Sequence, residues 1–307
     1  MRWEDARRSD NIEDRRGEDY ADAAGGGGPM LGGAGHLGIG TMIVLGVIAY
    51  ALGIDPRILI GGAEMLNNVR GGGQQVEQQA PRQQQQQTRQ TGAPSDQIGQ
   101  FVSAILGQNE DVWSQVLPAQ KNIKFTPAPL VLFNGATRSA CGAAQSAMGP
   151  FYCPLDKKIY LDTSFFRDMQ QKFGGGGDFA YAYVISHEMG HHIQDLLGIL
   201  GKVQRAQQQA DDQAQANALS VRIELQADCL AGVWAANANA RWHNIDPDDI
   251  QKAIATAQAI GDDRLQKSSR GYAVPDSFTH GSSAQRVQWL QRGMQSGQID
   301  SCNTFAR

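Results

Sequence analysis

The chain of 307 residues has little cysteine and no large excess of charge of either sign. Its four cysteines never stand in a Cys-x-x-Cys pair, which excludes a zinc knuckle and a thioredoxin-like redox motif. The 27 basic and 31 acidic residues give a net charge of -4, which provides no general attraction to nucleic acid or to anionic lipid. We therefore expect no nucleic-acid partner.

One apolar run stands out, at residues 37–54, and it carries no charged side chain. About 20 apolar residues in a helix cross the hydrocarbon layer of a bilayer, so this run predicts a single transmembrane anchor. A buried core helix and a cleaved signal peptide are the alternatives. A signal peptide is disfavoured because the preceding segment of 36 residues is long, mixed in charge and rich in glycine.

Arginine is more frequent before this run than after it. Five arginines precede the run, and two lie in the 20 residues that follow it. Positively charged residues near a span tend to stay in the cytoplasm. The bias therefore predicts a cytoplasmic N-terminus and places the chain after residue 54 in the periplasm or outside the cell.

Composition divides the rest of the chain into three parts. Residues 1–36 are charged and then glycine-rich, so we expect a flexible tail without a fold. Residues 55–96 are rich in glutamine and glycine and predict a low-complexity linker. Apolar residues become periodic from residue 97, so one folded domain is expected over residues 97–307.

Residues 97–307 carry the pattern of a mainly helical α+β domain. Helical spacing or strong helix formers occupy residues 97–116, with a break near Gly107, and residues 179–197, 202–240, 247–264 and 283–293. Two short runs, PLVLFNG at 129–135 and KKIYLD at 157–162, predict a small antiparallel sheet. KKIYLD as an edge strand could pair with an extended peptide through backbone hydrogen bonds.

The string HEMGH at residues 187–191 lies within the helix predicted at 179–197. His187 and His191 stand at i and i+4 on one helix face, so both imidazoles can reach one tetrahedral Zn²⁺. Glu188 lies about 100° round the same helix, beside the open position. The ion lowers the pKa of bound water, and Glu188 can accept its proton and pass it to a leaving amine. A coincidental helix with two histidines is the alternative.

A catalytic zinc ion takes three protein ligands, so a third must lie elsewhere in the chain. Glu224 and Asp228 stand four residues apart in RIELQADCLAG, on one face of a predicted helix. We assign Glu224 as the third ligand and Asp228 as the acceptor for the second ring N–H of His187. The alternative is a solvated acidic face, but the apolar neighbours mark this helix as partly buried.

These motifs resemble known zinc proteases. HEMGHH followed by ELQAD resembles the gluzincin pattern of HExxH plus ExxxD, found in thermolysin-like and prenyl-protein-processing membrane proteases. GPFYCP, KKIYLD, FAYAYVISHEMGHHIQ and ELQADCLAG more closely resemble a bacterial family of neutral zinc metallopeptidases, over residues 97–307 and the anchor. The resemblance implies a zincin-like domain, one catalytic Zn²⁺ and a peptide or protein substrate, and it does not name that substrate.

A peptidase also needs a donor for the oxyanion of its tetrahedral intermediate. His280 is the candidate and Arg286 the second choice, by similarity to a His-then-Arg segment near the end of membrane gluzincins. Gly281 stands where those proteins usually carry proline. An ordinary capping or surface role is the alternative for His280.

The meaning of the cysteines depends on the compartment. Outside the cytosol, Cys141 and Cys153 are expected to form a disulfide that restrains the loop before KKIYLD. Cys229 and Cys302 would then form a second one, and this pairing is one of three that are possible. In a cytosolic domain all four would be free thiols.

The sequence therefore predicts a membrane-anchored zinc endopeptidase whose partners are a peptide or protein substrate and the bilayer at residues 37–54. Its rival is a non-catalytic zinc-containing membrane protein that binds a partner. Intact Glu188 favours the enzyme, since a structural zinc site has no use for a base there. A hydrolase that acts on non-peptide amides or cell-wall peptides would use the same ligands.

Overall fold

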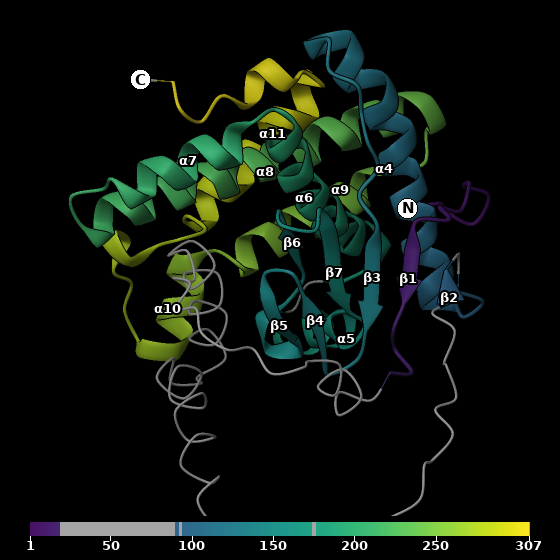
Figure 1. Ribbon diagram of the computed structural model, residues 1–307, viewed down its shortest axis with the longest axis horizontal. Coiled ribbons are helices and arrows are strands. Elements are labelled where there is room, and N and C mark those ends of the chain that lie inside the picture. The colour runs from purple at the N-terminus through teal and green to yellow at the C-terminus, as the bar shows by residue number, and fades with distance from the viewer. Residues whose placement is uncertain (19–89, 92–93, 174–175, 307) are drawn as a thin grey trace, which may run out of the picture.

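The computed structural model describes residues 1–18, 90–91, 94–173 and 176–306 (Figure 1). Within these ranges the chain is mainly helical with two small sheets, which is the α+β class expected from the sequence. No helix in them is both long enough and apolar enough to cross a membrane. The anchor predicted at 37–54 and most of the linker predicted at 55–96 lie outside the described residues.

The larger sheet has five strands in the order β2-β1-β3-β7-β6. Their bounds are β1 Ile12–Asp14, β2 Gln90–Thr91, β3 Leu130–Phe133, β6 Phe151–Cys153 and β7 Lys158–Asp162. β1, β3 and β7 run parallel, while β2 and β6 at the two edges run antiparallel to their neighbours. A separate hairpin joins β4 (Ala136–Ser139) to β5 (Gly142–Gln145).

The expectation of an antiparallel sheet is wrong for β3 and β7, which are parallel with Leu130 opposite Ile159. The chain between them passes through the β4–β5 hairpin and β6, and this excursion returns it to the starting end of the sheet, as a parallel pair requires. β7 lies between β3 and β6, so both of its backbone edges are paired. The expectation of KKIYLD as an edge strand is therefore also wrong, and the edge belongs to β6.

Eight α-helices supply the rest of the described fold. They are α4 Gln97–Lys121, α5 Ser164–Phe173, α6 Asp178–Leu196, α7 Ile199–Gln208, α8 Gln213–Trp242, α9 Pro247–Ala259, α10 Asp262–Arg270 and α11 Ser283–Ser296. The sequence between residues 202 and 240 forms a broken pair, α7 and α8, whereas α4 continues through Gly107 without the expected break. Short 3-10 turns lie at Ser146–Met148, Pro275–Ser277 and Ile299–Cys302.

Residues 1–18 belong to the fold, which corrects the expectation of a flexible tail over this part of residues 1–36. Ile12 is 1% exposed and pairs with Leu130 of β3. Several of the charges that suggested disorder are paired, and Arg16 bonds both Asp14 and Asp96. Composition misled here because backbone pairing with an existing sheet and these ion pairs offset the cost of ordering a short polar segment. Residues 19–36 lie outside the described residues.

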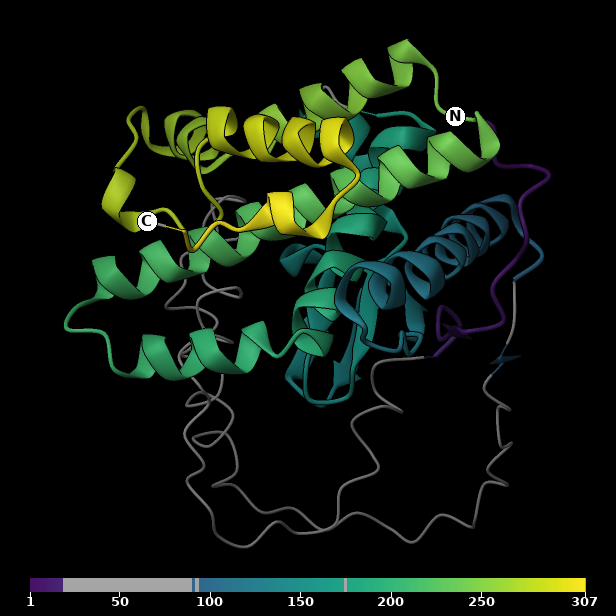
Figure 2. The same cartoon turned by 90° about the horizontal axis from the view of Figure 1, so that it is seen from above.

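Glycines allow the three helices around the centre of the molecule to approach closely. A Cβ on Gly190 of α6 would lie 3.0 Å from the carbonyl oxygen of Ala227 in α8. A Cβ on Gly293 of α11 would lie 1.9 Å from the carbonyl oxygen of Cys229 in α8. Figures 1 and 2 show α11 running beside α8, and α6 packs on α8 as well. Residues of all three helices can therefore meet in one place.

Both expected disulfides are present. Cys141 in the turn of the β4–β5 hairpin is bonded to Cys153 in β6. Cys229 in α8 is bonded to Cys302 near the C-terminus. The first bond ties the hairpin to the edge strand, and the second ties the C-terminal segment to α8.

Candidate metal centre

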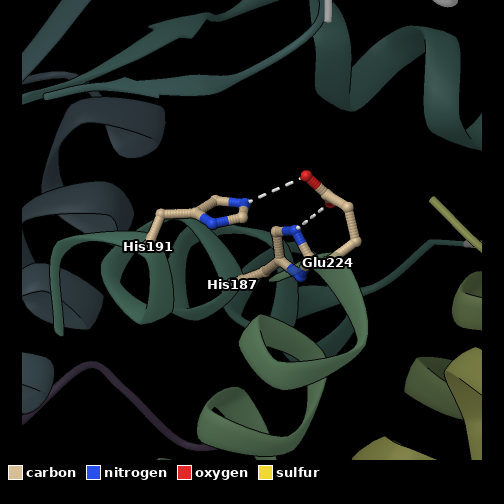
Figure 3. Close-up of side chains that lie close together, drawn as sticks. All are labelled: His187, His191 and Glu224. Carbon is tan, nitrogen blue, oxygen red and sulfur yellow. Dashed lines mark hydrogen bonds and ion pairs between the residues drawn. The ribbon is translucent and has the colours of Figure 1, made fainter. Parts of the chain in front are cut away.

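The two motif histidines and Glu224 converge from two helices. His187 and His191 project from α6, and Glu224 projects toward them from α8 (Figure 3). Nε2 of His187 lies 3.1 Å from Oε2 of Glu224, and Nε2 of His191 lies 3.5 Å from Oε1 of the same carboxylate. One ligand atom from each residue can be chosen so that all lie within 4.8 Å of one another.

This arrangement fits a zinc ion. Zinc bonds to histidine nitrogen and carboxylate oxygen are about 2.0–2.2 Å long, so tetrahedral ligand atoms lie about 3.3–3.5 Å apart. The contacts of 3.1 and 3.5 Å are close to that spacing, although each histidine meets a different oxygen of Glu224, and one ligand atom from each of the three residues lies within 4.8 Å of the others. Two histidines and one glutamate are also a ligand set of catalytic zinc sites, which leave a fourth position open.

Asp228 lies one turn beyond Glu224 in α8 and accepts a hydrogen bond from Nδ1 of His187 at 2.8 Å. The expected contact between Asp228 and His187 is thus present. It leaves Nε2 of His187 facing Glu224. Burial lowers the pKa of the His187 imidazole, but Asp228 and Glu224 outweigh burial and raise that pKa to about 10 when no metal is bound.

Asp228 is fully buried and receives further donors. Arg286 of α11 donates from Nε to Oδ2 and from Nη2 to Oδ1, each at 2.9 Å. Tyr183 of α6 donates its hydroxyl to Oδ1 at 2.6 Å. Burial raises the pKa of the Asp228 carboxyl, but Arg286 and His187 prevail and lower that pKa to about 2. The carboxylate is therefore held ionised and oriented.

Arg286 was our second choice for the oxyanion donor, and in the structure its guanidinium donates to Asp228. Its side chain is 4% exposed and is engaged with Asp228, Tyr183 and the carbonyl of Ile260. Sequence reasoning missed Tyr183 altogether. The available signal was its position four residues before His187, on the same face of the helix.

His191 has a partner of its own that the sequence analysis missed. Its Nδ1 lies 2.8 Å from Oε1 of Gln194, three residues further along α6. Gln194 in turn donates to the carbonyl oxygen of Ile223, the residue before Glu224. The two histidines are therefore both held through Nδ1, which is the usual way to fix the tautomer and ring direction of a metal ligand.

Glu188 is buried, with 7% of its surface exposed. Burial raises the pKa of its carboxyl, and the charges of His191 and His187 only partly offset this effect. Because a general base works best with a pKa near the operating pH, an elevated carboxyl pKa suits proton transfer.

His280 lies in the loop before α11, and this loop packs on α8, because a Cβ on Gly281 would lie 3.1 Å from the side chain of Leu225, the residue after Glu224. Burial lowers the pKa of His280, but the charge of Glu224 outweighs burial and raises that pKa. Nδ1 of His280 lies 3.5 Å from Oδ1 of Asp262, the first residue of α10. Oδ2 of Asp262 accepts the backbone N–H groups of Thr279, His280 and Gly281, at 2.8, 2.7 and 3.0 Å. Asp262, which sequence reasoning missed, therefore builds the turn that presents His280.

The backbone conformation explains why the residue after His280 is a glycine. Gly281 has a φ of +94°. Proline is fixed near −65° and cannot adopt this conformation. The departure from the His-Pro pattern of membrane gluzincins therefore accompanies a different backbone path at His280.

The edge strand β6 is attached to the end of α6. The hydroxyl of Tyr152 lies 3.1 Å from Oδ2 of Asp195 and 3.1 Å from Nδ1 of His192. Nε2 of His192 lies 2.6 Å from the carbonyl oxygen of Thr126, to which it can donate. The residues that follow the HEMGH string thus connect the histidine helix to the strand at the sheet edge.

Comparisons with known proteins agree with this geometry. Residues 1–305 match the family described as "Putative neutral zinc metallopeptidase". The uncharacterized protein YpfJ of Escherichia coli strain K12 is 46% identical over 312 residues, which cover 100% of this chain and 99% of that protein. The uncharacterized protein Rv2575 of Mycobacterium tuberculosis is 42% identical over 227 residues, which cover 70% of this chain and 74% of that protein. No solved structure matches the chain. The chain belongs to the neutral zinc metallopeptidase family.

Proposed function

We propose that the protein is a zinc-dependent endopeptidase. The observation that carries the proposal is the buried carboxylate of Glu188, which follows His187 in α6 and interacts electrostatically with His191, His187 and Glu224. Three ligands leave a fourth zinc position open, and a carboxylate that can act as a base there is the feature that a hydrolytic site needs and a structural zinc site lacks.

His187, His191 and Glu224 would hold the ion, which supplies a Lewis acid that activates water and polarises the peptide carbonyl. Glu188 accepts a proton from the attacking water and delivers it to the leaving amine. Its buried position favours the protonated carboxyl that the second transfer needs.

His280 stabilises the oxygen of the tetrahedral intermediate. With Nδ1 next to Asp262, Nε2 is the ring nitrogen available to a substrate. Burial disfavours the cationic ring, but Glu224 and Asp262 outweigh burial and raise the pKa of His280. A cationic donor is the stronger partner for an oxyanion.

The free edge of β6 binds the substrate backbone in this proposal. Among the described strands β6 pairs only with β7, and it contacts α6. An extended peptide can add to such an edge through main-chain hydrogen bonds, with little selectivity for side chains. This replaces the role expected for residues 157–162.

We also propose that the catalytic domain works outside the cytoplasm, in the periplasm or beyond, and that residues 37–54 attach the chain to a bilayer. The two disulfides support the compartment, because disulfides persist in oxidising environments. The uncharged apolar run supports the attachment.

The test uses the full chain in detergent, with metal analysis and with casein and a peptide library as substrates. We expect one zinc ion per chain in wild type and in Glu188→Gln, and cleavage that falls about 100- to 10,000-fold in the variant. Asp248→Asn, at an exposed acidic residue of α9, is the control and should cleave like wild type.

Two results would decide against the enzyme. One zinc ion per chain without cleavage of any substrate by wild type would favour a zinc protein that binds a partner. Equal cleavage by wild type and Glu188→Gln would remove Glu188 from the mechanism.

A further inference from the structure

The two ends of the segment between residues 18 and 90 are joined in one sheet. β1 lies inside the sheet, with β3 on one side and β2 on the other, as Figure 1 shows beside the label N. Ile12 and Asp14 of β1 face Leu130 and Leu132 of β3 in a parallel ladder. Asp14 of β1 also faces Gln90 of β2 in an antiparallel one. The chain therefore leaves the sheet at β1 and returns to the neighbouring position at β2.

Side chains attach the same segment to α4. Glu110 of α4 is 7% exposed, and its carboxylate accepts from Arg7 at 2.8 Å, Ser9 at 2.7 Å and Asn11 at 2.6 Å. A buried carboxylate without partners is strongly destabilising, so Glu110 needs the hydrogen-bond donors that residues 7–11 supply. Gly107 shows the same fit, because a Cβ there would lie 2.5 Å from the carbonyl oxygen of Arg7.

The segment also reaches the helix that carries the metal ligands. The indole N–H of Trp3 donates to Oδ2 of Asp178, the first residue of α6, at 3.0 Å. The ring of Trp3 packs edge-on against Phe101 of α4 with centroids 5.3 Å apart. The N-terminal segment is thus part of the body that holds the candidate centre.

Arg16 connects the end of β1, where the chain leaves the sheet, to the start of α4, which follows β2. It follows β1, and its guanidinium contacts Oδ1 and Oδ2 of Asp96 at 3.0 and 2.6 Å. Asp96 is the residue that caps the start of α4. The two flanks are therefore joined by backbone pairing, by a buried polar cluster and by this ion pair.

This arrangement is incompatible with a single membrane crossing between the flanks. One crossing would place β1 and β3 on opposite sides of about 30 Å of hydrocarbon, and paired strands cannot be separated by a bilayer. Two crossings need about 40 apolar residues, but 37–54 is the one long uncharged apolar run between residues 19 and 89.

We propose that residues 1–18 and the catalytic body lie on the same side of the membrane, because strand pairing and buried polar contacts join them in one folded unit. This inference rests on the membrane attachment proposed above. It replaces the expected topology of a cytoplasmic N-terminus and an external catalytic domain.

The test is cysteine labelling of the full chain in membranes. Asp5→Cys reports on the N-terminal segment and Ser268→Cys on α10, and both positions are exposed. Each variant is treated with a membrane-impermeant maleimide in right-side-out and in inverted vesicles. The parent chain, whose four cysteines are disulfide-bonded, is the blank, and detergent-solubilised protein gives the full signal.

We expect both cysteines to be labelled from the same face and the protein to sediment with the vesicles. Labelling from opposite faces would overturn the proposal. Labelling from one face with protein that does not sediment would overturn the membrane attachment on which this inference rests. Labelling of both from the cytoplasmic face would uphold the shared side and refute the proposed compartment. None of these outcomes depends on peptidase activity, so failure of the catalytic proposal is seen separately.

Discussion

Arg286 and Asp228 form a buried, two-pronged ion pair directly behind His187, with both N···O distances at 2.9 Å. Asp228 contacts His187 at 2.8 Å on its other side. The position of the histidine ring is thereby linked to α11, a helix that contributes none of the three candidate ligands. Removing either partner would leave the other as an isolated buried charge, which is far more costly than an exposed one.

Arg286→Leu should therefore destabilise the protein by about 3–5 kcal/mol and weaken zinc binding by about 10- to 100-fold. Urea unfolding of the metal-free chain and zinc titration against a chelator measure the two effects. Arg292→Leu removes an exposed arginine of the same helix and should change stability by about 0.5 kcal/mol or less. Similar losses in the two variants would contradict a special role for Arg286.

Tyr183→Phe should lower the free energy of unfolding by about 1.5–3 kcal/mol, because it removes a hydrogen bond to the charged and buried carboxylate of Asp228. Tyr181→Phe is the matched control, since its hydroxyl lies in the same helix but contacts the carbonyl of Phe166 instead. Unfolding free energies of both variants decide the matter. If Tyr181→Phe loses as much stability as Tyr183→Phe, the contact with Asp228 contributes nothing specific.

His280→Ala should lower kcat/KM by about 100- to 1,000-fold, the loss found on removal of an oxyanion donor. The zinc content should stay at the wild-type level, because His280 is not among the candidate ligands. Steady-state cleavage and metal analysis of the same preparations provide the measurement. Unchanged kcat/KM would return His280 to an ordinary structural role in its loop.

Zinc affinity should rise with pH up to about pH 10. The pKa of His187 is raised from 6.5 to about 10 in the metal-free protein, where Asp228 and Glu224 outweigh the opposing effect of burial. Zinc must displace the proton on His187, so zinc binding strengthens as the proton concentration falls. Chelator competition at several pH values measures the slope, and Asp228→Asn should flatten it.

The stability of the metal-free protein should follow the opposite trend. The pKa of His187 is about 10 in the folded protein and 6.5 in the unfolded chain. Protonated His187 therefore stabilises the fold fully below pH 6.5, and this contribution is lost as pH rises through about 10. Unfolding of the chelator-treated protein at pH 6 and pH 9.5 tests the sign. Greater stability at the higher pH would contradict the proposed charge arrangement.

Ile12→Ala should destabilise the protein by about 2–5 kcal/mol, because the side chain is 1% exposed inside the sheet. Asp10→Ala, at an exposed neighbouring position, is the control and should be nearly neutral. Thermal or urea unfolding of the full chain provides the measurement. No difference between the two variants would restore the flexible tail that composition alone suggested.

Much of the candidate centre could be predicted from local sequence because its residues lie in two short helical motifs. The i, i+4 spacing of His187 and His191, and of Glu224 and Asp228, follows from helix geometry whatever the rest of the fold is. The disulfide pairs were also within reach, since four cysteines allow few pairings.

The partners of these residues could not be predicted in the same way. Arg286 is 58 residues from Asp228, and nothing local distinguishes it from any other helical arginine. Asp262 is 18 residues from His280 and acts mainly through backbone groups, which leave no trace in residue types. The parallel pairing of β1 with β3 joins residues more than 100 positions apart.

The sequence by itself determined two pairs, His187 with His191 and Glu224 with Asp228, because adjacent turns of one helix place such side chains on the same face. Only the tertiary structure brought α6 and α8 together, added Arg286 and Tyr183 behind Asp228, and decided where β1 belongs. Burial and strand pairing are properties of the assembled fold, so a polar segment such as residues 1–18 gains order only when a sheet and buried partners such as Glu110 are there to receive it.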